Sequence, residues 1–129
     1  MNKTVVSIND NNKNARRLIS IIEEFRKLDP EMQAQTITLF LTVVSRPGIS
    51  MKELVQSTGL ASSSVSRNVA ALSDTHRKGE AGHNLLRAYE DPEDRRTKRV
   101  DVTPKGQRVY ATLIAILAGG LPNDSQIEG

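Results

Sequence analysis

The 129-residue sequence contains no cysteine and no tryptophan, and its aromatic side chains are limited to two Phe and two Tyr. The absence of cysteine excludes disulfide frameworks, cysteine-ligated zinc, iron–sulfur clusters and thiol nucleophiles. So few aromatics argue against stacking platforms for single-stranded nucleic acid. No apolar run approaches the ~18 residues that span a membrane, and the polar residues 1–14 lack the apolar core of a secretory signal. We therefore expect a single soluble, cytoplasmic domain.

The patterns that accompany catalysis and bound cofactors are also missing. The sequence has no Gly-x-Ser-x-Gly nucleophile elbow and no glycine-rich phosphate loop. His76 and His83 lie in a predicted loop without the further ligands that a metal site requires. We therefore expect no enzymatic activity, no metal and no cofactor.

The basic residues are concentrated in one segment. The chain carries 18 Lys and Arg against 15 Asp and Glu, a net charge of +3. Residues 95–108 hold a large share of the basic side chains and a single acidic one, Asp101. An anionic partner is expected to bind where the charge is focused in this way. The basic residues of the segment are Arg95, Arg96, Lys98, Arg99, Lys105 and Arg108.

Hydrophobic periodicity predicts two helices in the first third of the chain. Residues 1–12 are expected to form a flexible arm, and residues 13–28 a helix with apolar side chains at intervals of three and four. Asp29 and Pro30 suit the cap and the first position of a second helix, which is predicted to end near Ser45.

Two short helices joined by a glycine turn are predicted next. Ser50 and Glu53 form a capping-box pattern at the start of the third helix. Gly59 stands where a left-handed residue would end it. A fourth helix is predicted over residues 62–74, with apolar residues facing inward and polar residues facing outward; the polar face carries Ser63, Ser64, Ser66, Arg67 and Asn68.

The second half of the chain predicts a β-hairpin and a last helix. After a loop over residues 75–84, strands are expected over 85–90 and 97–102, joined by the turn 91–96. Thr103 and Pro104 suit the start of a helix that extends to about residue 118, followed by a flexible tail over 119–129. The predicted fold class is therefore mainly α with a small β-hairpin, a winged helix-turn-helix in one domain over residues 13–118.

A helix-turn-helix with a basic hairpin favours duplex DNA as the partner. The second helix of such a pair presents small polar and basic groups to the major groove. Serine hydroxyls and free backbone amides suit phosphate oxygens, while arginine can bridge guanine and asparagine can bridge adenine. In the alternative interpretation the serines only cap a helix, Arg67 is a solvated charge, and the basic run guards the edge of a strand.

The hairpin resembles the wing of the MarR family of winged-helix regulators. Wings in this family follow the pattern Asp-x-Arg, five residues, then Leu-Thr-x-x-Gly. This chain has Asp94-Arg95-Arg96, residues 97–101, then Val102-Thr103-Pro104-Lys105-Gly106, with Val in place of Leu. Leu60, Val65-Ser66-Arg67 and Leu72 also fit the recognition helix of the family. The resemblance covers residues 48–113, about half of the chain.

The resemblance implies a transcriptional regulator, which we expect to be a repressor, acting as a homodimer on a pseudo-palindromic duplex. It assigns Arg96 to the minor groove and Asp94 to the carboxylate that steadies it. A narrow, A·T-rich minor groove concentrates negative potential, which attracts arginine. The expected DNA-binding residues are Ser62, Ser63, Ser64, Ser66, Arg67, Asn68, Arg87, Asp94, Arg95, Arg96, Lys98 and Arg99.

The chain departs from the family pattern in three places. Ala61 stands where the family usually has a Ser or Thr cap, so that Ser62 would cap the helix instead. Residues 80–84 resemble a five-residue insertion before the wing. The chain ends soon after the last predicted helix, where family members usually add another that builds much of the dimer interface. A dimer would then use helices 13–28 and 104–118, unless their apolar stripes only form intramolecular core.

Two other functions stay open at the level of sequence. A winged-helix domain can dock on another protein, such as replication or polymerase machinery. It can also bind DNA without sequence preference, as an architectural or replication-origin protein. The sequence identifies neither the operator nor an effector ligand, and the scarcity of aromatic residues leaves no evident effector pocket.

Overall fold

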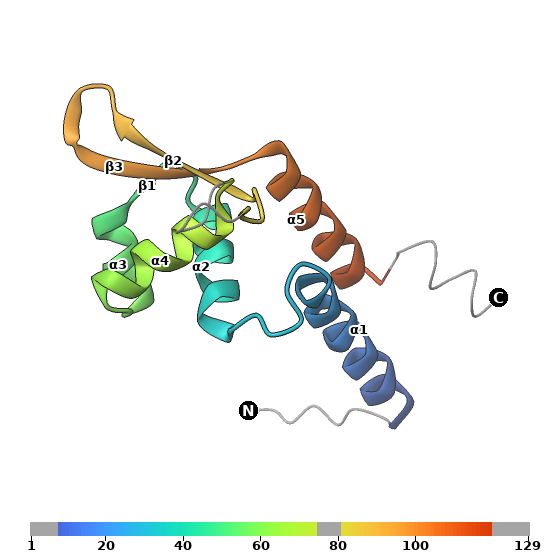
Figure 1. Cartoon of the computed structure of the whole chain (residues 1–129). Helices are drawn as coiled ribbons and strands as arrows, with labels where there is room; N and C mark the ends of the chain where they lie inside the picture. Colours follow the sequence, from blue (N-terminus) through green and yellow to red (C-terminus); the bar gives the residue numbers. More distant parts are fainter. Residues whose placement is uncertain (1–7, 75–80, 120–129) are drawn as a thin grey trace, which may run out of the picture.

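The computed structural model describes residues 8–74 and 81–119, which form five helices and one small sheet (Figure 1). The predicted fold class, mainly α with a winged helix-turn-helix, is confirmed. None of the described helices combines the length and apolarity that crossing a bilayer requires. The elements are α1 (Ile8–Arg26), α2 (Ala34–Ser45), β1 (Ile49–Ser50), α3 (Met51–Thr58), α4 (Ser62–Leu72), β2 (Leu86–Asp91), β3 (Asp94–Val102) and α5 (Pro104–Leu117).

Helix α2 lies at the centre of the core. Its side chains Leu39, Phe40 and Val43 are completely buried, and α3, α4 and the strand β3 pack against it. Phe25 of α1 meets Phe40 edge to face, with the ring centroids 6.0 Å apart. Burial of these apolar surfaces supplies the main favourable free energy of folding. Helices α1 and α5 pack together at the end of the molecule remote from the hairpin of β2 and β3 (Figure 1).

The first two helices begin at different residues from those that the pattern predicts. Helix α1 begins at Ile8, so the prediction of a flexible arm is wrong for residues 8–12; residues 1–7 lie outside the described part. Helix α2 begins at Ala34 and not at Pro30. The Asp29 carboxylate accepts a hydrogen bond from the Glu31 amide at 2.9 Å, which stabilises a turn there in place of a helical start.

Local signals predict the helix-turn-helix closely. The capping box of α3 is confirmed, because the Glu53 amide donates to Ser50 Oγ and the Ser50 amide donates to the Glu53 carboxylate, each at 3.0 Å. Gly59 ends α3 in the left-handed region at φ +73°, as predicted. The prediction that Ser62 caps α4 is wrong, since Ala61 occupies the cap position without a side-chain hydrogen bond. Helix α4 ends at Leu72, two residues earlier than predicted.

The sheet has one strand more than the predicted hairpin. Its order is β1-β3-β2, with both pairs antiparallel. The two-residue strand β1 places Ile49 opposite Val100, and both side chains are buried. The connection of β2 and β3 is also shorter than predicted, because Asp91 pairs directly with Asp94 and leaves a two-residue turn.

The described part of the presumed insertion closes the end of α4. The amides of Gly82, His83, Asn84 and Leu85 donate to backbone carbonyls of residues 71–74 at 2.7–3.1 Å. They satisfy carbonyls that the end of a helix leaves without intrahelical partners. A Cβ at Gly82 would lie 1.9 Å from the Ser73 carbonyl oxygen, so this close approach requires glycine. The rest of the predicted loop, residues 75–80 with His76, lies outside the described residues.

The start of α5 follows the prediction. The Gly106 amide donates to Thr103 Oγ1 at 3.0 Å, and Pro104 occupies the first turn. The helix ends at Leu117, and residues 120–129 of the predicted tail lie outside the described part.

Substitution of Gly106 by alanine is expected to destabilise the fold. A Cβ there would lie 2.3 Å from the Leu85 carbonyl oxygen and 2.7 Å from Val102 Cγ1, so α5 would have to move away from the sheet. We expect Gly106→Ala to lower the free energy of unfolding by about 1–3 kcal/mol, the usual cost of overpacking. Urea denaturation measures this loss, with Gln107→Ala, an exposed position on the same helix, as control. Equal stability of the two variants would contradict the close packing of α5.

Candidate nucleic-acid interface

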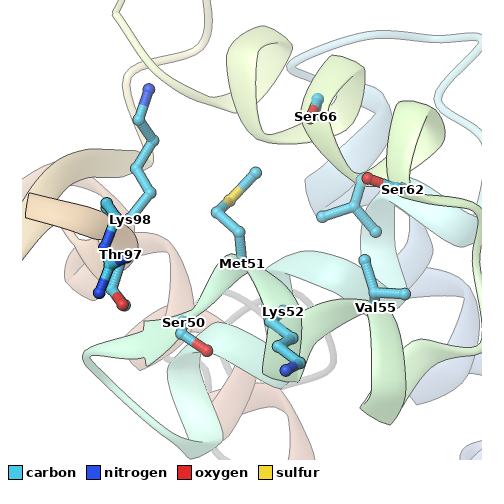
Figure 2. Close-up of a pocket in the computed structure, with 10 residues that line it drawn as sticks. Ser50, Met51, Lys52, Val55, Ser62, Ser66, Thr97 and Lys98 are labelled. Atoms are coloured by element: carbon cyan, nitrogen blue, oxygen red, sulfur yellow. The ribbon is translucent and has the colours of Figure 1, made fainter.

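A hollow of about 490 Å³ lies between the start of α3, the start of α4 and the wing strand β3. Figure 2 shows Met51 within it, with Lys98 on one side and the hydroxyls of Ser62 and Ser66 on the other. The floor is partly apolar and the rim is cationic. The lining residues are Ser50, Met51, Lys52, Val55, Ser62, Val65, Ser66, Arg96, Thr97 and Lys98. Four of the predicted DNA-binding residues, from two separate elements, therefore line one surface.

The outer face of α4 is small, polar and basic. Ser62, Ser63, Ser66 and Arg67 are exposed, and Ser64 is half-buried. Because Ala61 offers no side-chain cap, the first amides of α4 keep donors that no side chain occupies. The N-terminus of a helix also carries a partial positive charge from the aligned peptide dipoles. This end of α4 is therefore suited to phosphate oxygens.

Asn68 lies on the inner side of α4, and the prediction that it belongs to the exposed face is wrong. Its side chain is 9% exposed. Thr36 Oγ1, on α2, donates to Asn68 Oδ1 at 2.5 Å, and Asn68 Nδ2 donates to the Ser64 carbonyl at 2.9 Å. Both functional atoms of the amide are thus engaged inside the protein, so Asn68 is removed from the set of base-contacting residues.

The tip of the wing carries an arginine that contacts a neighbouring carboxylate. Glu90 pairs with Lys98 and Asp91 pairs with Asp94, so residues 95–97 bulge out of the ladder. Bulges re-aim side chains at the end of a strand. The Asp94 carboxylate accepts from the Arg96 amide at 3.2 Å, from Arg96 Nε at 3.5 Å and from the Thr97 hydroxyl at 3.0 Å. The contact between Asp94 and Arg96 that the resemblance implies is therefore present.

This contact orients Arg96 more than it stabilises the fold. The Arg96 side chain is 94% exposed. An ion pair in water adds little net free energy. Arg95, beside it on the bulge, is also exposed. The bulge thus presents two guanidinium groups to solvent on a short, hydrogen-bonded frame.

Arg99 braces the wing internally, although we expected it to face a phosphate. Its Nε donates to the Asp91 carboxylate at 2.8 Å and its Nη1 donates to the Gly48 carbonyl at 2.9 Å. Side chains alternate along a strand, so Arg99 projects from the face of β3 opposite to Lys98. It joins the wing to the turn before β1, and we leave it out of the interface.

Two carboxyl groups near the wing have pKa values below their ordinary range. The hydrogen bond from Arg99 is the main cause that lowers the pKa of Asp91 below its ordinary value, and the Glu93 amide adds to it. The pKa of Glu53 is lowered chiefly by the Ser50 amide, with a smaller contribution from Arg46. Both carboxylates therefore stay ionised in the folded protein at neutral pH.

Arg87 also lies on the face away from the hollow. It pairs with Asp101 across the hairpin, on the side of Tyr89 and Arg99, and its guanidinium stands 4.8 Å from the centre of the Tyr89 ring. The structure therefore separates Arg87 from the surface that α4 and Lys98 share.

Six residues of the hollow were not among the predicted DNA-binding residues, namely Ser50, Met51, Lys52, Val55, Val65 and Thr97. Of these, Met51, Lys52 and Val55 lie on α3, which the pairing of β1 with β3 brings beside the wing. A two-residue strand leaves no periodic signal, although Lys52 beside the Ser50 cap was visible as a basic residue in a first helical turn. Among residues 8–74 and 81–119, no three His, Asp or Glu side chains converge as ligands for a metal ion.

Comparison with known proteins identifies the fold. No protein-family model matches the sequence, and no curated protein matches it. The structure is similar to a MarR transcriptional regulator from Methanosarcina mazei Go1 (TM-score 0.60, 16% identity, 84% of this chain and 71% of that one). It is also similar to S. aureus MepR in a complex with DNA (TM-score 0.59, 13% identity, 92% of this chain and 82% of that one). A third similar structure is PcaV from Streptomyces coelicolor in complex with its natural ligand (TM-score 0.54, 18% identity, 98% of this chain and 90% of that one). The chain therefore has the winged-helix fold of MarR transcriptional regulators.

Acidification should break the ion pair between Asp91 and Arg99 that braces the wing. Because the pKa of Asp91 is lower in the folded than in the unfolded chain, its contribution to stability is present above the unfolded value of about 3.9. That contribution is lost as the pH falls through the folded value. We expect NMR titration to place the Asp91 midpoint below about 3.9, and Arg99→Gln to move it upward. Arg87→Gln, on the same strand face, is the control. If Arg99→Gln leaves the midpoint unchanged, Arg99 does not lower the pKa of Asp91.

Proposed function

We propose that the chain is a transcriptional regulator that binds double-stranded DNA sequence-specifically, as a homodimeric repressor on a pseudo-palindromic site. One observation carries the proposal: Ser62 and Ser66 of α4 and Arg96 and Lys98 of the wing line the same hollow. A duplex laid across this surface meets the helix in one groove and the wing in the next. The fold shared with the DNA-bound MepR structure supports this arrangement.

Helix α4 reads the major groove in this proposal. Ser62 and the free amides of the first turn hold a phosphate and set the register of the helix on the duplex. Ser63, Ser66 and Arg67, which are exposed, face the base edges. Arg67 has the donor geometry to bridge the two acceptors of guanine.

The wing reads the adjacent minor groove. Arg96 enters the groove, where narrow A·T-rich sequence concentrates negative potential. A long side chain loses rotamer entropy when it is immobilised. Asp94 reduces that loss because it already holds the guanidinium near one orientation in the free protein. Arg95 and Lys98 neutralise the flanking phosphates.

The dimer forms through α1 and α5. Six large apolar side chains on these two packed helices are between 36% and 61% exposed, which is unusual for so small a domain. On each helix they project to one side, because their spacing of one, three or four residues keeps them within one face. A second copy would cover them. The residues are Leu18, Ile19, Ile22, Tyr110, Ile114 and Leu117.

Repression follows from occupancy. A dimer that holds both grooves over a promoter excludes polymerase sterically, and this requires no additional surface.

Two alternatives, docking on a protein and DNA binding without sequence preference, predict different experimental results. Phosphate contacts release counterions and give a steep fall of affinity with salt, which protein docking does not. Selection from random duplexes yields a consensus only for a protein that reads sequence.

Substitution of Arg96 by alanine is expected to weaken binding to the selected duplex by about 1–3 kcal/mol. The reason is the loss of a guanidinium from the minor groove. Fluorescence polarisation at several salt concentrations measures the affinity. The control is Arg108→Ala, which removes the same charge from an exposed position on the side of α5 opposite to the apolar stripe. If Arg96→Ala and Arg108→Ala bind alike, the wing does not enter the groove.

A charge in the exposed apolar stripe should dissociate the dimer. Ile22→Glu places a carboxylate where α1 would be covered by the second copy, and burial of an unpaired charge is strongly unfavourable. We expect analytical ultracentrifugation to show a dimer for the unsubstituted chain and a monomer for Ile22→Glu. Leu41→Glu is the matched control, since Leu41 is 37% exposed on α2, outside the stripe. An Ile22→Glu variant that stays dimeric would place the dimer interface elsewhere.

A further inference from the structure

A buried polar contact joins α4, the recognition helix of the proposed function, to the centre of the core. Thr36 in the first turn of α2 and Asn68 in the middle of α4 are 8% and 9% exposed. The Thr36 hydroxyl donates to Asn68 Oδ1 across a sequence separation of 32 residues. The Asn68 amide nitrogen donates in turn to the Ser64 carbonyl, one turn earlier in α4. A chain of hydrogen bonds thus connects α2 to the first half of α4.

The position of Asn68 on the helix couples this contact to the exposed face. Successive residues of an α-helix are separated by about 100° around its axis. Asn68 follows Arg67 directly and precedes the buried Val69, so it lies at the edge of the inner face. Any rotation of α4 about its axis therefore moves Asn68 against α2 and Arg67 across the outer face by the same angle.

Apolar packing and hydrogen bonding restrain such a rotation in different ways. Val65, Val69 and Leu72 bury the inner face of α4, and apolar contacts have no preferred direction. A rotation of about 20° displaces an atom at about 6 Å from the axis by about 2 Å. A shift of that size breaks a hydrogen bond, whose donor–acceptor distance spans only about 2.5–3.2 Å. The bond between Thr36 and Asn68 therefore adds a directional restraint to the one that the packed valines provide.

Other polar restraints act elsewhere on α4. At its N-terminal end, Ala61 provides no side-chain cap. At its C-terminal end, the amides of residues 82–85 hold the last carbonyls. The exposed residues Ser63, Ser66 and Arg67 lie in the first half, where the contact between Thr36 and Asn68 joins the helix to α2.

A buried hydrogen-bonded pair adds little net stability compared with an apolar pair of the same shape. We propose that Thr36 and Asn68 are positioning residues that fix the rotation of α4, and through it the sequence selectivity of DNA binding. The inference rests on the proposed function. In this inference the pair of Thr36 and Asn68 determines how well the protein discriminates between base sequences. It does not determine the stability of the fold or the non-specific affinity for a duplex.

The test uses the full chain with the Thr36→Val/Asn68→Leu double variant, which replaces the polar pair by an apolar pair of similar shape. Thr36→Ser keeps the hydroxyl and is the matched control. Each protein is titrated with the duplex obtained by random selection and with a scrambled duplex of the same composition. The selectivity is the ratio of the two dissociation constants. Thermal unfolding and the salt dependence of binding are recorded in parallel.

We expect the selectivity of the double variant to fall about tenfold or more, the size of one lost base contact. Its affinity for the scrambled duplex, its salt dependence and its thermal stability should stay near those of the unsubstituted chain. Thr36→Ser should retain the selectivity. A role in stability alone would instead lower the melting temperature and weaken binding to both duplexes together.

The outcomes separate the two hypotheses. If the unsubstituted chain selects a sequence and the double variant keeps the same selectivity, the inference is wrong and the proposed function stands. If the unsubstituted chain binds all duplexes with equal affinity, the proposed function is wrong and the inference fails with it. Thr36→Val alone adds a check, since it leaves Asn68 Oδ1 without its donor and should reduce selectivity in the same direction.

Discussion

The pairing of β1 with β3 is the constraint on which the arrangement of the site depends. It joins parts of the chain about fifty residues apart, so closing this long loop has an entropic cost. The Gly48 amide donates to the Val100 carbonyl at 2.9 Å, and Arg99 returns a hydrogen bond to the Gly48 carbonyl. Burial of Ile49 and Val100 against the core offsets the cost. Because α3 begins directly after β1, this pairing also brings α3 beside the wing.

Strong and weak interactions are divided between different parts of the molecule. The buried side chains of α2 and their neighbours hold the fold, whereas the wing tip has solvent-exposed hydrogen bonds to Asp94, from Thr97 Oγ1 at 3.0 Å and from Arg96 Nε at 3.5 Å. Contacts of the second kind contribute little to stability. They can still narrow the range of orientations that an exposed arginine samples, which lowers the entropy lost on binding. A surface can therefore be pre-ordered without being part of the core.

The sequence predicts those features that depend on neighbouring residues. The capping box of Ser50 and Glu53, the left-handed Gly59 and the start of α5 at Thr103 and Pro104 each satisfy backbone groups within a few positions. The contact of Asp94 with Arg96 is local in the same sense, and the family resemblance pointed to it.

The features that sequence reasoning missed depend on partners far along the chain. Asn68 looks like a polar residue on an outer face until Thr36 is known to lie beside it. Arg99 looks like a phosphate ligand until Gly48 is placed 2.9 Å from its guanidinium. For both, the type of residue is compatible with binding DNA, and only the tertiary structure shows that its donors or acceptors are occupied. In a basic segment, each charge must therefore be assigned by its contacts and not by its type.

In the dimer that we propose, the interface at one end of the molecule sets the spacing of the DNA-binding elements at the other. The exposed apolar stripe of α1 and α5 lies remote from the hairpin, as Figure 1 shows. A twofold axis through that stripe fixes the separation of the two α4 helices, which must match about one helical turn of DNA, or a multiple of it. The edge-to-face contact of Phe25 with Phe40 and the turn at Asp29 connect α1 to α2. Since Thr36 of α2 contacts Asn68 of α4, two buried contacts lie on the path from the proposed dimer axis to α4. A small change at the junction of α1 and α2 would then alter half-site spacing without touching the DNA.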